Sequence, residues 1–365
     1  MKKNAELLGV MKEYEQRSKT FESFTEELKK LIFNLLKESG VNVLSVESRT
    51  KDNESLKKTL AKKEKEITRL NDIPDISGLR IITFFTDDVD LAANVIETEF
   101  DIDEENSVDK RLMLDPDRFG YLSLHYVVRL SASRQKLTEY RRFKNCHAEV
   151  QIRSILQHAW AEIEHDLGYK SKLGVPKDIR RRFSRLAGLL EVADDEFVKI
   201  RDELSNYEEN VPERIAKAPE SVLIDGASLA SFIETNPIVQ KLDSKIASLT
   251  NSELKLKPAR AVDILIYMLH FNGISTIAEL ESSLRTKQEI LLKYTNLWYP
   301  KGTDIVTPGI CINFLCDFLV GKTKSLKIIR NYLKFVPELD ISEQRTTLVA
   351  NHILSVYSKM KDNPS

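Results

Sequence analysis

The stretch from Cys146 to Ser154 alternates between apolar and polar side chains, which is the period of a β-strand. Ala148, Val150 and Ile152 fall on one face of this strand, where they can join a hydrophobic core. The opposite face carries an imidazole, an acid, an amide and a guanidinium, contributed by His147, Glu149, Gln151 and Arg153. Such a row is typical of the floor of a cleft, although a solvated strand face is the simpler alternative.

Helical and strand patterns interleave from residue 41 to residue 170, which predicts a mixed sheet flanked by helices. The segment Ile76–Phe85 is so apolar that we expect it to be a central, buried strand. Further strands are expected at residues 41–46, 108–112 and 121–130, and helices at 4–39, 53–70, 88–100, 155–167 and 177–206.

The pattern changes near residue 210, where Pro212, Pro219 and Gly226 indicate a linker-like span. The rest of the chain reads as short amphipathic helices with little strand signal. The sequence therefore predicts an α+β domain over residues 1–209, followed by an all-α domain over residues 210–365 that is a candidate regulatory region.

The composition limits the classes of function open to the chain. Its 365 residues are enough for two domains, and 42% hydrophobic with 30% charged residues is typical of a soluble globular protein. The net charge is −1, so any polyanion site must be a local cluster. Three cysteines are too few for a disulfide framework. With no leader or membrane-spanning pattern in the sequence, we expect a cytoplasmic protein without membrane contact.

Two carboxylates stand at the ends of predicted strands. Asp75 precedes the buried strand, and Glu149 lies on the alternating strand. If the two strands are neighbours, these side chains converge and make a plausible Mg²⁺ site. The alternative for Asp75 is that it only closes the turn after Pro74. Arg80 lies inside the apolar strand, and a charge there needs a partner.

Basic side chains gather where a polar loop leads into the second predicted helix. They are Arg49, Lys51, Lys57 and Lys58, and the helix start has a capping residue at Asp52 or Asn53. A helix N-terminus with cations around it binds phosphate well. Lysines on a solvated helix face are the alternative.

Two further features allow more than one interpretation. Gly120 lets the backbone approach a ligand, and Tyr121 beside it can stack on a base, or the pair is a hairpin glycine and a core tyrosine. The dipeptide His165-Asp166 suggests a metal phosphohydrolase, but that chemistry needs ligands from other helices, and no histidine precedes His125.

Together these segments resemble the RelA/SpoT-type alarmone synthetase family, over about residues 20–205. The compact layout is similar to the small synthetases and their toxin relatives, with no room for an N-terminal hydrolase domain. The blocks that carry the resemblance are, in chain order, Ser48–Lys51, Asp75–Ile82, Gly120–His125, Glu149–Ser154, His158–His165 and Tyr169-Lys170.

The resemblance implies a nucleotidyltransferase-like fold and a pyrophosphokinase, which moves the β,γ-pyrophosphate of ATP to the ribose 3′-hydroxyl of GDP or GTP. The products, ppGpp and pppGpp, are the alarmones of the stringent response. On this basis Asp75 and Glu149 hold Mg²⁺, and Glu149 also helps to deprotonate the attacking hydroxyl. The resemblance implies that Arg80 is a catalytic residue together with Asp75 and Glu149. The positions that match residues gripping ATP are Arg49, Lys51, Lys58 and Arg80.

On the acceptor side, the resemblance implies that Tyr121 stacks on guanine. Acceptor-side, supporting or phosphate-contacting roles fall to His125, Gln151, Arg153 and Lys170. The chain departs from the family at Leu122 and Phe119, where other members carry polar or basic residues. These departures leave the identity of the acceptor open.

Toxic relatives use the 3′ end of tRNA or adenosine nucleotides as acceptors, which is the first alternative. Basic residues that could bind a tRNA backbone are Arg134, Lys136, Arg141, Arg142 and Lys144, with Arg180, Arg181, Arg182 and Arg185. A second alternative is an inactive nucleotide-binding module. In either case residues 210–365 are candidates for contact with a regulatory protein or a second copy of the chain, or for neutralising a toxin.

Overall fold

The computed structural model describes residues 2–62, 67, 69–111, 123–169, 176–255, 260–299, 303–337 and 342–361. The chain divides into two compact units, Met1–Asp202 and Glu203–Ser365. The division falls inside one long helix, a few residues before the boundary near 210 that the sequence predicts. Among the described residues, no helix combines the length and the apolar character that crossing a membrane requires.

The elements that begin in the first unit are, in chain order, α1 (Lys2–Glu38), β1 (Val43–Thr50), α2 (Asn53–Lys62), η1 (Leu70–Asp72), β2 (Ser77–Thr83), α3 (Asp87–Glu99), β3 (Phe100–Ile102), β4 (Val108–Asp109), β5 (Leu124–Leu130), η2 (Arg134–Lys136), η3 (Arg141–Phe143), β6 (Ala148–Ser154), α4 (Ile155–Tyr169) and α5 (Lys177–Lys217), where η marks a short 3₁₀ helix.

One mixed sheet organises this unit, with strand order β1-β2-β6-β5-β3 and with β4 paired to β5. β2 and β6 run parallel, and the other neighbours run antiparallel. All residues of β2 are buried except Arg80, which is partly exposed, so the prediction of a central buried strand is confirmed. The predicted mixed sheet with flanking helices is also confirmed.

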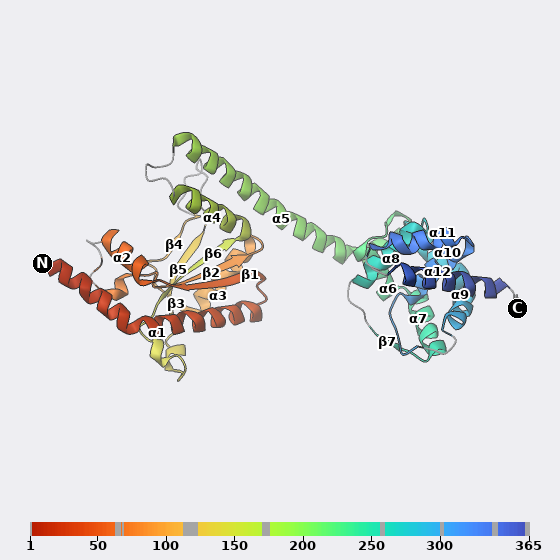
Figure 1. Cartoon of the computed structure of the whole chain (residues 1–365), viewed down its shortest axis with the longest axis horizontal. Helices are drawn as coiled ribbons and strands as arrows, with labels where there is room; N and C mark the ends of the chain where they lie inside the picture. The colour runs from red at the N-terminus through yellow and green to blue at the C-terminus, as the bar shows by residue number, and fades with distance from the viewer. Residues whose placement is uncertain are drawn as a thin grey trace. The chain divides into compact units, whose positions relative to one another are not determined.

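Helices cover both faces of the sheet (Figure 1). α1 and α3 pack on one face, and α4 lies across the other. α1 faces the sheet with an apolar stripe at helical spacing, formed by Val10, Tyr14, Phe21, Phe24, Leu28, Ile32 and Leu36. Each buried side chain of this size contributes about 1.5–3 kcal/mol, so the stripe fixes α1 on the sheet.

Two boundaries differ from the sequence predictions. Residues 47–50 were expected in a loop but belong to β1, because Thr50 pairs with Ser77 and shares a buried hydroxyl network with Thr25. A linker was expected from residue 210, but α5 continues through Pro212 to Lys217. Val211 is buried and Ile215 packs on the second core, which offsets the hydrogen bond that proline cannot donate. The turn expected at 115–120 lies outside the described residues.

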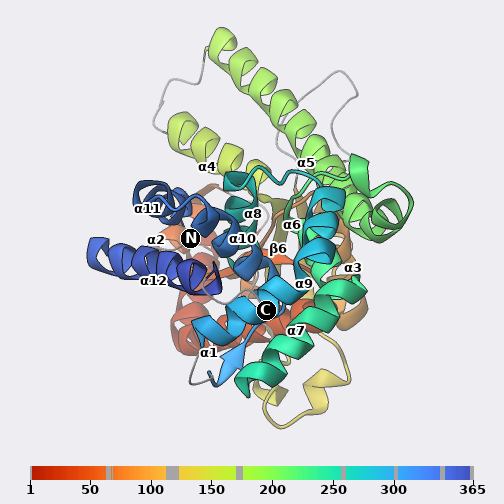
Figure 2. The same ribbon diagram turned by 90° about the vertical axis from the view of Figure 1, so that its right-hand side faces the viewer.

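The second unit is helical, as predicted, apart from the two-residue strands β7 and β8. Its helices pack on one core, and α7 lies beside α9 (Figure 2). Tyr294 is fully buried, and Trp298 and Tyr299 pack around Phe314, so these aromatic residues belong to the core of this unit. Its elements are η4 (Pro219–Ser221), α6 (Gly226–Thr235), α7 (Pro237–Thr250), β7 (Glu253–Leu254), α8 (Arg260–Phe271), α9 (Ile277–Trp298), β8 (Ile305–Val306), α10 (Ile310–Lys322), α11 (Leu326–Phe335) and α12 (Glu343–Lys361).

Candidate active site

One row of paired residues crosses the sheet on the face that α4 covers. Glu47 on β1 pairs with Arg80 on β2, Arg80 pairs with Gln151 on β6, and Gln151 pairs with His125 on β5. Paired residues of neighbouring strands project to the same face of a sheet. The register therefore brings an acid, a guanidinium, an amide and an imidazole from four strands into one line.

The next row places Glu149 in the middle of the sheet. Arg49 on β1 pairs with Gly78 on β2, and Gly78 pairs with Glu149 on β6. A Cβ atom added at Gly78 would lie 3.5 Å from both Cγ and Nε of Arg49, so the Arg49 side chain lies over this glycine. The bare backbone at Gly78 leaves that side chain room between β1 and Glu149.

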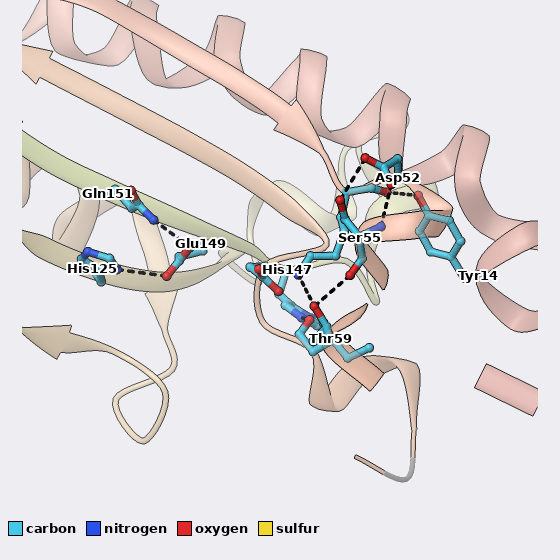
Figure 3. A network of polar contacts seen from close by, with 11 residues as sticks. Tyr14, Asp52, Ser55, Thr59, His125, His147, Glu149 and Gln151 are labelled. Atoms are coloured by element: carbon cyan, nitrogen blue, oxygen red, sulfur yellow. Dashed lines mark hydrogen bonds and ion pairs between the residues drawn. The ribbon is translucent and has the colours of Figure 1, made fainter. Parts of the chain in front are cut away.

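Two neighbours on the sheet hold the carboxylate of Glu149 (Figure 3). Nδ1 of His125 lies 3.0 Å from Oε1, and Nε2 of Gln151 donates to Oε2 at 3.0 Å. Burial raises the pKa of Glu149, but the hydrogen bond and charge of His125 and the hydrogen bond of Gln151 outweigh it, so the pKa lies below its usual value. The group is ionised at neutral pH and is ready to bind a cation or accept a proton.

His125 is itself fixed from its other side. Its Nε2 lies 2.6 Å from Oγ of Ser123, a fully buried residue. Because the Glu149 carboxylate can only accept, Nδ1 of His125 carries the hydrogen shared with Oε1, and Nε2 shares a second hydrogen bond with the Ser123 hydroxyl. Ser123 thereby sets the ring orientation that His125 presents to Glu149.

Glu149 lines two cavities. The first, of about 320 Å³, is also lined by Lys51, Thr59 and Asp75. The second, of about 250 Å³, is also lined by Arg49, Arg80, Gln151 and Glu162. Asp75 and Glu149, which were predicted to converge, thus line the first cavity together, and Asp72 is a third acidic residue there. Of the predicted cations, Lys51 lines the first cavity, and Arg49 and Arg80 line the second.

In the first cavity, Asp75 is engaged by Lys51. Nζ of Lys51 lies 2.5 Å from Oδ2 of Asp75 and donates to Oγ1 of Thr59 at 3.0 Å. The Lys51 side chain is only 9% exposed, which is unusual for lysine and requires such partners.

In the second cavity, Arg80 has the partners that its place in an apolar strand required. Its Nη1 lies 3.0 Å from Oε1 of Glu162 on α4 and 3.5 Å from Oε2 of Glu47 on β1. Glu162 also faces Nη2 of Arg153 at 3.5 Å. Arg153 is 2% exposed and lies behind the cavity, so it supports α4 and does not line either cavity.

The remaining predicted site residues fall elsewhere. Lys58 is exposed on α2 and lines neither cavity. Tyr121 and Lys170 lie outside the described residues, as do Gly120, Leu122 and Phe119.

From the sequence, no individual role was assigned to Thr59, Ser123 or Glu162, although Ser123 and Glu162 lie in blocks that carry the family resemblance. Ser123 stands two residues before His125, so the strand period would have placed both on one face. Glu162 follows His158 by four residues, which puts both on one helix face. Nδ1 of His158 lies 3.9 Å from Oε1 of Glu162. Nothing in the sequence singles out Thr59, because its contact with Lys51 depends on where α2 docks.

The residues present suit a magnesium ion. Asp75 and Glu149 offer carboxylate oxygens to one cavity, and Mg²⁺ is commonly held by one or two carboxylates together with substrate phosphates. Within the described ranges, no group of three or more acidic, histidine or cysteine side chains forms a metal site. A metal here would therefore depend on oxygens that a phosphate ligand brings.

The fold and the cavities define a class of protein: an α+β domain whose sheet lines two cavities with cations and carboxylates. Residues 48–173 match the family described as "Region found in RelA / SpoT proteins". The chain is 31% identical to GTP pyrophosphokinase YwaC of Bacillus subtilis (strain 168) over 160 residues, 43% of this chain and 73% of that protein. It is 29% identical to GTP pyrophosphokinase YjbM of the same organism, over 44% of this chain and 72% of that protein.

Among solved structures, the chain is similar to the small alarmone synthetase 1 from Bacillus subtilis, with a TM-score of 0.43 and 24% identity. The match covers 53% of this chain and 99% of that one. On the sequence relationships above, the chain belongs to the RelA/SpoT family.

Proposed function

We propose that the first unit is an ATP-dependent pyrophosphokinase that transfers the β,γ-pyrophosphate of ATP to the ribose 3′-hydroxyl of GDP or GTP, giving ppGpp or pppGpp and releasing AMP. As a member of its family, the chain is a pyrophosphotransferase of the GTP diphosphokinase type. The observation that carries the proposal is the position of Glu149, which lines both the cavity of Asp75 and Lys51 and the cavity of Arg49 and Arg80.

In this proposal the phosphates of ATP lie against Arg49, Lys51 and Arg80. Pyrophosphoryl transfer is mainly a matter of positioning and of neutralising charge, so cations on a rigid sheet are the groups it needs. Glu47 and Glu162 orient Arg80, because charged hydrogen bonds limit the positions of its planar head. Arg49 is placed by the close approach over Gly78.

Asp75 and Glu149 would hold Mg²⁺, which, when bound, neutralises charge on the phosphate oxygens. The Glu149 carboxylate takes the proton of the attacking 3′-hydroxyl, a role that its ionised state supports. His125 and Gln151 keep that carboxylate oriented through one hydrogen bond to each oxygen.

The acceptor assignment rests on family resemblance. Tyr121 would stack on guanine and Lys170 would contact a phosphate. The names of the two relatives, which are GTP pyrophosphokinases, support guanosine nucleotides as acceptors.

The test is to incubate the purified full chain with ATP, Mg²⁺ and either GDP or GTP, and to separate the nucleotides. A 3′-pyrophosphorylated guanosine nucleotide is expected with the wild type and not with Glu149→Gln. If neither GDP nor GTP yields such a product, the proposed reaction is refuted.

A tRNA acceptor is the alternative, favoured by the exposed arginines Arg180, Arg181 and Arg182 at the start of α5. The other basic segment, residues 134–144 around η2 and η3, lies beside α1. The start of α5 lies beside α4, on the opposite side of the sheet (Figure 1). The two segments therefore do not form one continuous basic surface. Incubating tRNA with γ-labelled ATP decides the matter, because tRNA that remains unlabelled rules this acceptor out.

A further inference from the structure

The ammonium group of Lys51 occupies the place beside Asp75 where a metal cation would be expected. Its Nζ atom lies 2.5 Å from Oδ2 of Asp75, and the side chain is 9% exposed. Lysine is rarely buried to this extent without a partner, because removing its charge from water is costly. Asp75 supplies the countercharge.

Contacts from α1, from α2 and from the residue before β2 fix the position of this lysine. Its backbone N–H donates to Ile76 at 2.8 Å, and the hydroxyl of Tyr14 on α1 donates to its carbonyl. On α2, the hydroxyl of Thr59 donates to the carbonyl of Ser55 at 3.0 Å, which leaves its lone pairs to accept from Nζ. Figure 3 shows Tyr14, Ser55 and Thr59 gathered on this side of the site. The ammonium is therefore tethered in place.

The other carboxylates of the cavity are also engaged, because Glu149 accepts hydrogen bonds from His125 and Gln151, and Asp72 accepts one from the backbone N–H of Arg69. A divalent cation that uses Asp75 in the nucleotide-free protein must displace Lys51 or share the carboxylate with it. Two like charges a few ångströms apart repel each other even in a well-solvated site. Mg²⁺ also gives up its water reluctantly and normally gains its remaining ligands from substrate phosphates.

We propose that Lys51 substitutes for the metal in the nucleotide-free protein and so makes metal binding depend on the nucleotide. When ATP binds, its phosphates offer the ammonium a new partner, and Asp75 becomes free to hold the cation that arrives with the nucleotide. Lys51 thus selects the metal–nucleotide complex over free metal. This inference rests on the proposed function, in that Asp75 and Glu149 are taken as the metal carboxylates.

The experiment measures Mn²⁺ binding, as a spectroscopic substitute for Mg²⁺, to the full chain without nucleotide, by electron paramagnetic resonance of free Mn²⁺. Lys51→Met keeps an unbranched side chain that lacks only the terminal ammonium, and so removes the charge. It is expected to bind Mn²⁺ about tenfold more tightly than the wild type, since a nearby positive charge is lost. Lys37→Met, which removes a charge from an exposed position on α1, is expected to leave the affinity unchanged.

The double variant Lys51→Met/Asp75→Asn separates this effect from a general change in charge. It is expected to lose the gain, because the freed carboxylate is the ligand that the single variant exposes. Equal affinity of Lys51→Met and wild type overturns the inference, and so does a gain that persists without Asp75.

The result is independent of catalysis. An inactive wild type whose Lys51→Met variant still gains Mn²⁺ affinity through Asp75 would refute the proposed reaction and leave the role of Lys51 standing. An active wild type whose Lys51→Met variant shows no gain in Mn²⁺ affinity would support the proposed reaction and refute the role of Lys51. Thermal unfolding of each variant establishes that it is folded before binding is compared.

Discussion

Arg80 on β2 and Glu162 on α4 form an ion pair of 3.0 Å at the wall of a cavity that Glu149 also lines. The pair connects the helix that follows β6 with the neighbouring strand. Arg80, which the proposed reaction uses, is therefore oriented by α4, although α4 is far from β2 in the sequence.

Replacing Glu162 by glutamine should weaken the binding of ATP. The guanidinium of Arg80 keeps Glu47 at 3.5 Å but loses its closer carboxylate, so it is less well oriented for phosphate. We expect KM for ATP to rise about three- to tenfold with kcat within a factor of about two, as for an interaction that contributes mainly to ground-state binding. Glu164→Gln on the same helix is the control. A fall in kcat at unchanged KM would contradict this role.

Replacing Glu149 by glutamine should abolish turnover while the protein stays folded. Glutamine keeps the shape of the side chain but can neither accept the hydroxyl proton nor contribute a charged metal ligand. A loss of at least about 10³-fold in kcat is expected, in the range for removal of a general base. Initial rates of pyrophosphate transfer measure it, with Glu105→Gln as a control at an exposed position. Activity within tenfold of wild type would exclude Glu149 as the base.

His125 should act through the orientation of Glu149. In His125→Ala the carboxylate loses the hydrogen bond at Oε1 and keeps only Gln151, so its position is less defined. A fall of about 10- to 100-fold in kcat with little change in KM for ATP is expected, because small misplacements of a reacting group have effects of this size. His125→Gln, which retains a donor, should recover part of the loss. Identical behaviour of the two variants would argue against a hydrogen-bonding role.

The stability of the second unit should depend on pH through Asp317. This side chain on α10 accepts hydrogen bonds from Tyr332 at 2.9 Å and Asn313 at 3.0 Å, and burial raises its pKa to about 7 despite them. The folded-state pKa exceeds the usual value of 3.8, so the stabilisation is complete below about pH 4 and is lost as the pH rises through about 7. Up to about 4 kcal/mol of unfolding free energy is involved.

Urea unfolding at pH 5 and pH 8 measures this effect in the full chain. The two tryptophans lie in different units, so in a Trp160→Phe background the fluorescence of Trp298 reports the second unit alone. Asp317→Asn should remove most of the difference between the two pH values, whereas Asp304→Asn, at an exposed position, should retain it. An unchanged difference in Asp317→Asn would assign the pH dependence to other groups.

Parts of this molecule follow from local pattern. The alternation around Glu149 predicted which residues of β6 face the core, and Ala148, Val150 and Ile152 are all fully buried. The apolar run around Ile81 predicted a buried central strand for the same reason, since burial on both faces leaves little room for polar side chains. The sequence also predicted that Arg80 needs a charged partner. It did not predict that Glu47 and Glu162 would be the partners.

Other features depend on contacts between distant segments. The end of β1 at Thr50 is set by pairing with β2 and by the hydroxyl of Thr25, neither of which a local pattern contains. The persistence of α5 through Pro212 depends on the burial of Val211. The engagement of Lys51 by Asp75 and Thr59 depends on the docking of α2.

The sequence by itself determined the periodicities, and with them the strands, the helices and the residue types on the polar face of the sheet. Only the tertiary structure decided which of those side chains meet. The register between β1, β2, β6 and β5 and the docking of α2 and α4 place Glu149 between two cavities, give Arg80 its carboxylates and put Lys51 on Asp75. The physical reason is that periodicity depends on neighbours a few residues apart, whereas charges pair across a sheet according to packing of the whole domain.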